Sequence, residues 1–354
     1  MINVIIPMSG EALYETSGDF IYPKILTEVS NKTLLEYSQE IFGTLTESNK
    51  LIYVAPQDKL NKLGLASIIK TISNNEGHIL PLQGSTKGAV CSCLMAIDIL
   101  SSMEDELIIS SADHYIHDDL QNIINTFRSL DADAGVLTFE SVHPKWSFVK
   151  LNAEKNVVQA AEKNAISRTA IAGLYYFKKA GDFVEAAKNL IRKDAHFHDV
   201  FYLSGCLNEL VLLGKKIKCR PLRDSVYHNF YDAHAVKSFE LAQSSFTGNI
   251  KNSTLEYVRA FSERNLERVI DFFDKDAVLV EPGKTFTGRN EIETMLQGLF
   301  AENEKLSFFA RNIIADGLKS TIEFNLSLND VQLSGVDFIE WSSKGKIIKL
   351  SAYL

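Results

Sequence analysis

The first residues suited to chemistry lie in the loop that follows the apolar residues 2–6. This loop contains Gly10, and a glycine-containing turn after a buried strand can bring backbone N–H groups against phosphates. Lys24 follows Pro23, and a lysine beside a rigid proline can present a fixed ammonium group to a phosphate. Most turns with a single glycine are structural, so the Pro-Lys pair is the stronger indication of a phosphate site.

A second candidate is Asp113, which follows the apolar residues 106–110. A carboxylate at the end of a strand can bind a divalent cation, or it can simply hold the strand end in place. Taken by themselves, the residues around Asp113 favour the structural role.

Short apolar segments alternate with amphipathic segments through the first half of the chain. The predicted strands are residues 2–6, 51–55, 106–110 and 134–139, and the predicted helices are residues 34–42, 60–72 and 120–130. This alternation predicts an α/β fold in which helices cover both faces of a parallel or mixed sheet. Because the chain begins with a strand, the loop with Gly10 lies at the carboxyl end of that strand, where open α/β sheets bind ligands.

The pattern changes near residue 245. Residues 244–253 are small, polar and glycine-containing, which predicts a linker. Residues 254–354 then give helical spacing first and alternating apolar and polar residues afterwards, which is typical of an α+β module. We therefore expect a first domain over residues 1–243 and a second over residues 254–354.

Composition limits the classes of function. The 354 residues are 45% hydrophobic and 23% charged, values that exclude a disordered or fibrous chain. The net charge of −8 repels phosphate backbones, so we expect no nucleic-acid partner and no binding to anionic membranes, whereas a local basic pocket for a small phosphorylated ligand stays allowed. The four cysteines match no zinc-site spacing, and no signal peptide or membrane-spanning segment is found, so a cytoplasmic location is expected.

Over residues 1–240 the chain resembles the sugar-phosphate nucleotidyltransferases, in particular their capsule-biosynthesis branch. Six segments carry the resemblance in the order that the family shows: residues 5–10 (IIPMSG), 22–29 (YPKILTEV), 83–89 (QG and KGA), 111–116 (SADHYI), 161–163 (AEK) and 172–177 (AGLYYF). The resemblance implies a Rossmann-like, GT-A-type mixed sheet flanked by helices.

The resemblance also implies a reaction. In this family a sugar phosphate attacks the α-phosphate of a nucleoside triphosphate, and pyrophosphate leaves as a nucleotide-sugar forms for capsule or surface polysaccharide synthesis. Lys24 matches the lysine that neutralises the triphosphate, Asp113 the carboxylate that binds Mg²⁺ or Mn²⁺, and Lys163 the lysine that holds the incoming sugar phosphate. On the nucleotide side the matching residues are Met8, Ser9, Gly10, Gln83 and Gly88, and on the sugar-phosphate side they are Glu162 and Gly173.

The sequence departs from the family at two places. In the first loop, Ala12, Leu13 and Tyr14 replace the second glycine, a hydroxyl residue and the arginine that grips the β- and γ-phosphates. At the second metal position, Asn229 replaces an aspartate, and Asp224 and Asp232 are the nearby acids that could substitute for it.

These departures leave other functions open. One is a protein that has kept the fold for nucleotide or sugar binding, or as a scaffold, and has lost catalysis. Another is a glycosyltransferase of the GT-A type, but those enzymes usually carry a D-x-D pair. Here the segment Ser111-Ala112-Asp113 holds one acid, so the glycosyltransferase ranks lower.

Residues 254–354 resemble the SnoaL-like and ketosteroid-isomerase-like group, a cone-shaped α+β fold also called NTF2-like. The residues that carry this resemblance are 256–261, 276–282, 286–289, 335–340, 345–347 and 352–353. It implies a pocket in which Glu281 is the general base, Tyr257 the oxyanion-hole tyrosine and Asp337 a protonated acid. This fold also serves in oligomerisation, commonly through its open sheet face, so an isomerase, an auxiliary pocket and a homo-oligomer all stay open.

Overall fold

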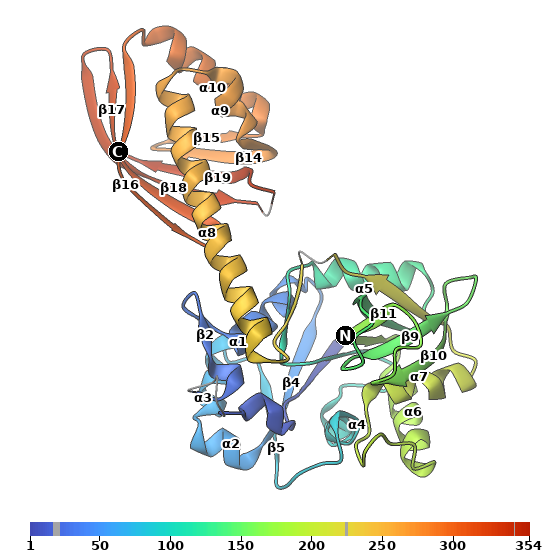
Figure 1. The fold of residues 1–354 in the computed structure, drawn as a ribbon. Coiled ribbons are helices and arrows are strands. Elements are labelled where there is room, and N and C mark those ends of the chain that lie inside the picture. The colour runs from blue at the N-terminus through green and yellow to red at the C-terminus, as the bar shows by residue number, and fades with distance from the viewer. Residues whose placement is uncertain (17–21, 224–225, 343) are drawn as a thin grey trace. The chain divides into compact units, whose positions relative to one another are not determined.

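The computed structural model of the chain describes residues 1–16, 22–223, 226–342 and 344–354. Internal contacts divide it into two compact units, Met1–Val236 and Lys237–Leu354 (Figure 1). Among the described residues, no helix combines the length and the apolar character that crossing a membrane requires.

The first unit is built on a nine-stranded mixed sheet. Seven strands form its main path in the order β10-β9-β11-β6-β1-β4-β5, while β8 pairs with β11 and β12. Their bounds are β1 Ile2–Pro7, β4 Asn49–Pro56, β5 His78–Leu82, β6 Glu106–Ser110, β8 Ala134–Glu140, β9 Ser147–Leu151, β10 Val157–Glu162, β11 Thr169–Phe177 and β12 Ile217–Pro221. Strand β1 runs parallel to both of its neighbours, β4 and β6.

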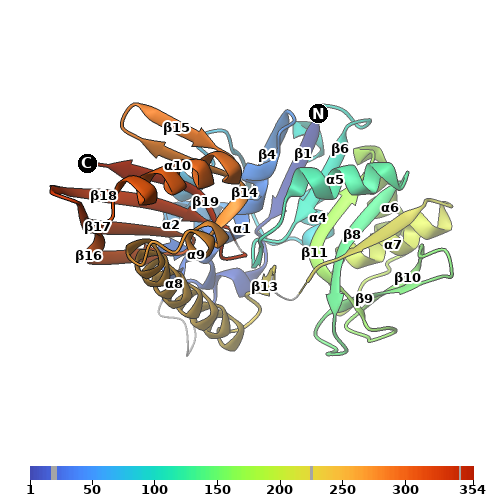
Figure 2. The same ribbon diagram turned by 90° about the horizontal axis from the view of Figure 1, so that it is seen from above.

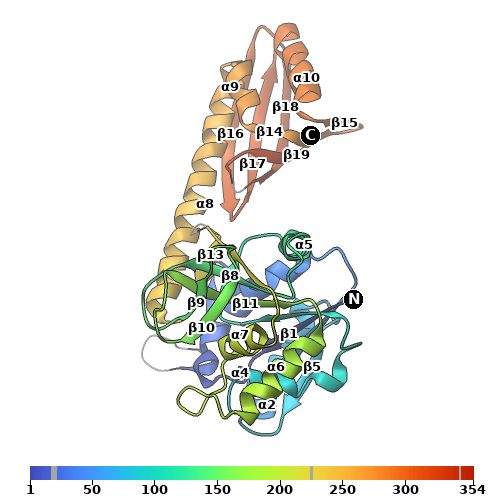
Figure 3. The ribbon, with the colours of Figure 1, turned by 90° about the vertical axis from the view of Figure 1, so that its right-hand side faces the viewer.

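Helices cover both faces of this sheet, as Figures 2 and 3 show. Their bounds are α1 Leu34–Gln39, α2 Gln57–Lys62, α3 Leu65–Ile72, α4 Ala89–Leu94, α5 Leu120–Ser129, α6 Ala180–Arg192 and α7 Leu203–Leu212. In β1, Ile5 packs into one hydrophobic core with α4, α6 and α7, whereas Val4 and Ile6 pack into the other with α1, α3 and α5. Burial on both faces explains why the first strand is a continuous apolar run.

Two short β-ladders complete the first unit. One pairs β2 (Glu28–Val29) with β3 (Lys32–Thr33), and the other pairs β7 (His114–Ile116) with β13 (Tyr227–Asn229). Single turns of 3-10 helix span Glu11–Tyr14, Lys24–Leu26, Glu40–Thr44 and Ile97–Ile99. Because β1 and β6 are parallel neighbours, the segments that follow them, residues 8–10 and 111–113, leave the same edge of the sheet.

The second unit contains a six-stranded sheet in the order β15-β14-β19-β18-β17-β16. The strands are β14 Phe273–Glu281, β15 Lys284–Thr287, β16 Leu306–Asp316, β17 Lys319–Leu328, β18 Val331–Trp341 and β19 Ile347–Tyr353. The helices are α8 Ala233–Ser262, which begins in the first unit, α9 Leu266–Asp271 and α10 Arg289–Glu302. Buried residues of these helices, such as Tyr257 and Leu296, share one core with residues of the sheet. The fold class is therefore the expected one, a mixed α/β sheet flanked by helices followed by a smaller β-rich α+β domain.

Residues 244–253, for which composition predicts a linker, lie inside helix α8. Ile250 is 2% exposed and packs into the core of the second unit, and Thr254 Oγ1 donates a hydrogen bond to the Ile250 carbonyl at 2.8 Å. Such packing outweighs the weak helix propensity of serine, threonine, asparagine and glycine. The division by contacts falls at residues 236 and 237, so the boundaries at 243 and 254 stay predictions.

Gly88 is a sharp constraint on the first unit, because its φ of 105° and ψ of 178° are accessible almost only to glycine. A β-carbon there would also lie 2.6 Å from the Phe201 carbonyl oxygen. We expect Gly88→Ala to lower the free energy of unfolding by about 2 kcal/mol or more, measured by chemical denaturation. Gly43→Ala is the matched control, since its β-carbon would meet nothing within 4 Å. Equal effects of the two substitutions would contradict this account.

Candidate functional site

The ammonium group of Lys24 is buried at the carboxyl edge of the first sheet. Lys24 is 2% exposed, and its Nζ lies 3.6 Å from Asp113 Oδ2 and donates to the Tyr231 carbonyl at 3.4 Å. A buried charge has to be paired, so the pairing explains how the lysine is tolerated. Two residues that the sequence singles out, far apart in the chain, are thereby brought together.

Asn229 lies near the segment with Asp113 because strand β13 pairs with strand β7. It pairs with His114, the residue after Asp113, and the next residue, Phe230, donates its backbone N–H to the Asp113 carbonyl at 2.8 Å. The Oδ1 atom of Asn229 accepts the backbone N–H of Tyr231 at 3.3 Å. The ladder thus brings Asn229 to the segment that carries Asp113.

Asp113 and Asn229 are better suited to a cation that a bound ligand also coordinates than to a site in which protein side chains supply every metal ligand. No cluster of three or more His, Cys, Asp or Glu residues suited to a metal occurs in the described parts of the chain. Magnesium usually takes one or two carboxylates together with substrate phosphates, and Asp113 and Asn229 could supply such a partial set. Of the two acids considered as substitutes, Asp224 lies outside the described residues, and Asp232 is paired with Lys145, with a distance of 3.4 Å from its Oδ2 to Nζ.

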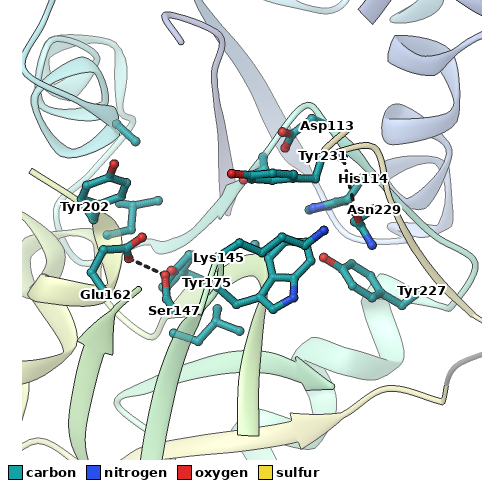
Figure 4. Close-up of a pocket in the computed structure, with 16 residues that line it drawn as sticks. Asp113, His114, Lys145, Ser147, Glu162, Tyr175, Tyr202, Tyr227, Asn229 and Tyr231 are labelled. Atoms are coloured by element: carbon teal, nitrogen blue, oxygen red, sulfur yellow. Dashed lines mark hydrogen bonds between the residues drawn. The ribbon is translucent and has the colours of Figure 1, made fainter. Parts of the chain in front are cut away.

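A cavity of about 190 Å³ opens beside Asp113 and Asn229 (Figure 4). Its lining is rich in aromatic residues and also includes both residues assigned to the sugar-phosphate side, Glu162 and Gly173. The complete lining is Ala89, Ser111, Asp113, His114, Lys145, Trp146, Ser147, Glu162, Ile171, Gly173, Tyr175, Tyr202, Leu203, Tyr227, Asn229 and Tyr231.

Glu162 is fixed by two serine hydroxyls. Ser147 and Ser204 both donate to its Oε2 atom, the second at 2.8 Å, and no described residue donates to Oε1. Burial raises the pKa of Glu162, while these hydrogen bonds and Lys163 oppose the rise. One carboxylate oxygen is therefore left for a ligand hydroxyl.

His114 forms the floor of the cavity in its neutral form. Burial lowers the pKa of His114 to about 4, and Asp113 only partly offsets this effect. Its Nε2 lies 3.2 Å from Ser110 Oγ. Gly173 has a φ of 75°, and a β-carbon there would meet His114 Nδ1 at 3.0 Å, so glycine keeps this wall open.

The residues expected on the nucleotide side do not line this cavity. Met8 is fully buried, Ser9 Oγ lies 2.6 Å from Ser92 Oγ, and Gln83 is exposed after β5. A β-carbon at Gly10 would meet no atom within 4 Å, and Gly88 precedes α4, whose first residue, Ala89, is part of the lining.

Tyr14, which stands where the family has its arginine, belongs to the core. It is 6% exposed, its hydroxyl donates to the Met8 carbonyl at 2.7 Å, and Lys59 Nζ lies 5.1 Å from the centre of its ring. Burial raises its pKa, and Leu13 is buried as well, whereas Ala12 is exposed. The segment with Tyr14, which corresponds to the family's contact with the β- and γ-phosphates, therefore packs into the core and holds the loop in place.

Lys163 is not among the residues that line the cavity with Asp113. Its Nζ lies 5.6 Å from the ring centre of Tyr202 and 5.8 Å from that of Phe197. Both rings line a second cavity of about 350 Å³, and Glu162 and Tyr202 line both cavities. Lys163 therefore lies beside a ring that both cavities share, and its role in binding the sugar phosphate stays a prediction.

Of the aromatic wall of the first cavity, sequence reasoning noted Trp146 and Ser147, whose segment resembles a substrate-side segment of the family, and assigned no role to Lys145 or Tyr231. Lys145, Trp146 and Tyr231 come from two segments far apart in the chain, and Trp146 reads equally well as a rim or a core residue. The available signal was a lysine and a tryptophan adjacent to each other just before strand β9. His114 was missed because its role depends on burial.

The first unit matches the model of a known protein family. A model of the nucleotidyl transferase family matches residues 21–203, which is just over half of the chain. The chain belongs to the nucleotidyl transferase family.

Solved structures agree with this fold. A nucleoside-diphosphate-sugar pyrophosphorylase from Vibrio cholerae RC9 is 20% identical, with a TM-score of 0.57, over 68% of this chain and 99% of that chain. An inositol-1-phosphate CTP transferase from T. maritima is 14% identical, with a TM-score of 0.52, over 68% of this chain and 94% of that chain. No curated protein matches the sequence.

The second unit of this nucleotidyl transferase matches a different family model. A model of the SnoaL-like domain matches residues 254–350. Within it, burial raises the pKa of the Tyr257 phenol, and the charges of Asp337 and Glu281 raise it further. The three residues of the expected pocket are therefore close enough to interact electrostatically.

Asp337 makes the stability of this domain depend on pH. Burial, aided by the charge of Glu281, raises the pKa of Asp337 to about 7 in the folded state, well above its ordinary value. Between about pH 4 and pH 7 the folded protein retains a proton that the unfolded chain has lost, so stability falls as the pH rises through this window. At about 1.4 kcal/mol per pKa unit, the loss is on the order of 4 kcal/mol.

We expect Asp337→Asn to remove this pH dependence, because the amide is a neutral analogue of the protonated acid. The chain has two tryptophans, so in a Trp146→Phe background the fluorescence of Trp341 reports denaturation of the second unit. Asp316→Asn, at an exposed position of the same domain, should leave the pH dependence unchanged. A parent protein whose stability is flat from pH 4 to pH 8 would contradict the prediction.

Proposed function

We propose that this nucleotidyl transferase joins the nucleoside monophosphate part of a nucleoside triphosphate to a sugar phosphate and releases pyrophosphate. The observation that carries the proposal is the meeting of the Lys24 ammonium group and the Asp113 carboxylate beside a cavity lined by Glu162 and Gly173. A cation and a carboxylate at the carboxyl edge of the sheet are the groups that a phosphate transfer needs.

In the proposed reaction an oxygen of the acceptor phosphate attacks the α-phosphorus of the triphosphate. A new P–O bond forms, the bond from the α-phosphorus to the bridging oxygen breaks, and pyrophosphate leaves with that electron pair. Lys24 neutralises charge on the triphosphate, and the free Oε1 atom of Glu162 accepts a sugar hydroxyl. Mg²⁺ or Mn²⁺ bound by Asp113 and Asn229 would neutralise phosphate oxygens.

The proposed product is a nucleotide-activated sugar, which is the form in which sugars enter capsule or surface polysaccharide synthesis. Nucleoside triphosphates are cytoplasmic substrates, and we accordingly place the reaction in the cytoplasm. The aromatic lining supports a sugar acceptor, because rings pack against the apolar faces of carbohydrates while Glu162 binds a hydroxyl group.

The test is pyrophosphate release with Mg²⁺, each of the four nucleoside triphosphates and a panel of sugar 1-phosphates. With the best pair, we expect Lys24→Met and Asp113→Asn each to lower kcat/KM by about 10²-fold or more, because each removes charge stabilisation. Lys188→Met, at an exposed position of α6, is the control. Circular dichroism checks the fold of Lys24→Met, since that residue is buried. No pyrophosphate with any pair would refute the proposal.

Burial of Tyr14 favours a second candidate, a protein that binds nucleotides or sugars without turning them over. No arginine reaches the phosphates from this loop, since the position is occupied by a ring in the core. Calorimetry separates the two candidates. Triphosphate binding that occurs with metal but without pyrophosphate release would favour the binding protein.

We further propose that the second unit pairs with a copy of itself through the outer face of its sheet. Phe309, Ile314, Phe338 and Tyr353 are each more than half exposed, while their neighbours Phe308, Ile313 and Ile339 fill the core. The rings of Phe338 and Tyr353 lie 5.9 Å apart. Exposed apolar patches of this kind mark interaction surfaces.

Self-association is tested by sedimentation equilibrium of the full chain. We expect a dimer for the parent protein, and at least a tenfold (about 1.4 kcal/mol) weaker dimer for Phe338→Glu, because the substitution places a charge in the apolar interface. Ile191→Glu, at an exposed apolar position of α6 in the first unit, is the control. A monomeric parent protein would refute this part of the proposal.

A further inference from the structure

Lys145 lies on a turn whose backbone is fixed from both sides. The Lys145 N–H donates to His143 Nδ1 at 3.2 Å, and the Trp146 N–H donates to the His143 carbonyl at 3.3 Å. The Trp146 carbonyl in turn accepts the N–H of Lys163 at 3.0 Å, which ties the turn to the end of β10. The side chain of Lys145 therefore starts from a defined position at the cavity wall.

The ammonium group of Lys145 lies between two rings and is paired with one acid. Its Nζ is 4.8 Å from the ring centre of Trp146 and 4.6 Å from that of Tyr231, and 3.4 Å from Asp232 Oδ2. The other oxygen of Asp232 accepts the Ala235 N–H at 2.9 Å at the start of α8. A half-exposed pair of this kind contributes little to stability, so a phosphate dianion can displace Asp232.

The Lys145 ammonium supplies positive charge that the rest of the described cavity lining lacks. Among the residues that the structure describes, Lys145 is the only lysine or arginine in the lining. Lys24, which is 2% exposed, is not part of the lining, and neither is Lys163, whose Nζ lies over the ring of Tyr202. A phosphate that enters beside the Asp113 and Glu162 carboxylates would otherwise meet mostly negative charge.

We propose that Lys145, rather than Lys163, binds the phosphate of the acceptor, and that Asp232 is the anion it leaves when the phosphate binds. This inference rests on the proposed function and identifies a binding residue of the same site. The assignment to the acceptor follows from the neighbouring residue Ser147, whose hydroxyl donates to Glu162 on the sugar side of the cavity. Tyr231 links the two cations, since its carbonyl accepts from Lys24 and its ring faces Lys145.

The first experiment separates the two lysines by steady-state kinetics. We expect Lys145→Met to raise the KM of the sugar phosphate by about tenfold or more, with less than a twofold change in the KM of the triphosphate, because a charge-assisted contact to the acceptor is lost. Lys145→Arg should restore most of the affinity. Lys163→Met should change the acceptor KM by less than about threefold, since an exposed cation adds little.

The second experiment uses Asp232→Asn, which keeps an oxygen for the Ala235 N–H but removes the competing charge. We expect this variant to bind phosphate severalfold more tightly than the parent, the opposite of Lys145→Met. Inorganic phosphate is the probe, and ³¹P NMR line broadening measures its affinity without turnover. If Lys145 had only a structural role, Lys145→Met and Asp232→Asn would not change the phosphate affinity in opposite directions.

The outcomes are distinct for the two proposals. If no pair of substrates releases pyrophosphate, the proposed function fails, yet phosphate binding still tests Lys145. Equal phosphate affinity of the parent and Lys145→Met, or a larger loss in Lys163→Met, overturns the inference. A rise in the triphosphate KM alone also overturns it, because the contact would then belong to the nucleotide.

Discussion

The burial of one ammonium group organises the candidate site. Lys24 can be 2% exposed only because Asp113 lies 3.6 Å away and the Tyr231 carbonyl accepts a hydrogen bond. That pairing requires residues 24, 113 and 231 to meet, and the parallel strands β1 and β6 together with the β7–β13 ladder bring them there. The cation, the carboxylate and the Asn229 amide are thus held at one edge of the sheet.

The distribution of positive charge around this edge differs from the pattern of the family. The loop after β1 gives a buried tyrosine where an arginine is expected, and the Tyr14 hydroxyl stabilises the loop by binding the Met8 carbonyl. A cation is present on the opposite wall, where Lys145 lies between Trp146 and Tyr231. The site therefore contains two lysines, each paired with an aspartate, and both of them contact Tyr231.

The second unit depends on a different constraint, the burial of an acid. Asp337 is 5% exposed and lies near Glu281 and Tyr257, which favours its protonated form. This arrangement is compatible with a ligand pocket, while the exposed rings of Phe338 and Tyr353 on the same sheet support self-association. Its SnoaL-like fold accommodates both uses.

The sequence by itself determined both folds and placed Gly10 and Asp113 after predicted strands of the first sheet. Buried strands are continuous apolar runs, and ligand-binding residues follow their carboxyl ends, so both signals are local in the chain. Only the tertiary structure decided that Lys24 pairs with Asp113, that Tyr14 faces the core, that Lys163 is not in the lining of the first cavity and that residues 244–253 are helical. Those outcomes depend on side-chain direction and on the packing of residues distant in sequence, which no local pattern contains.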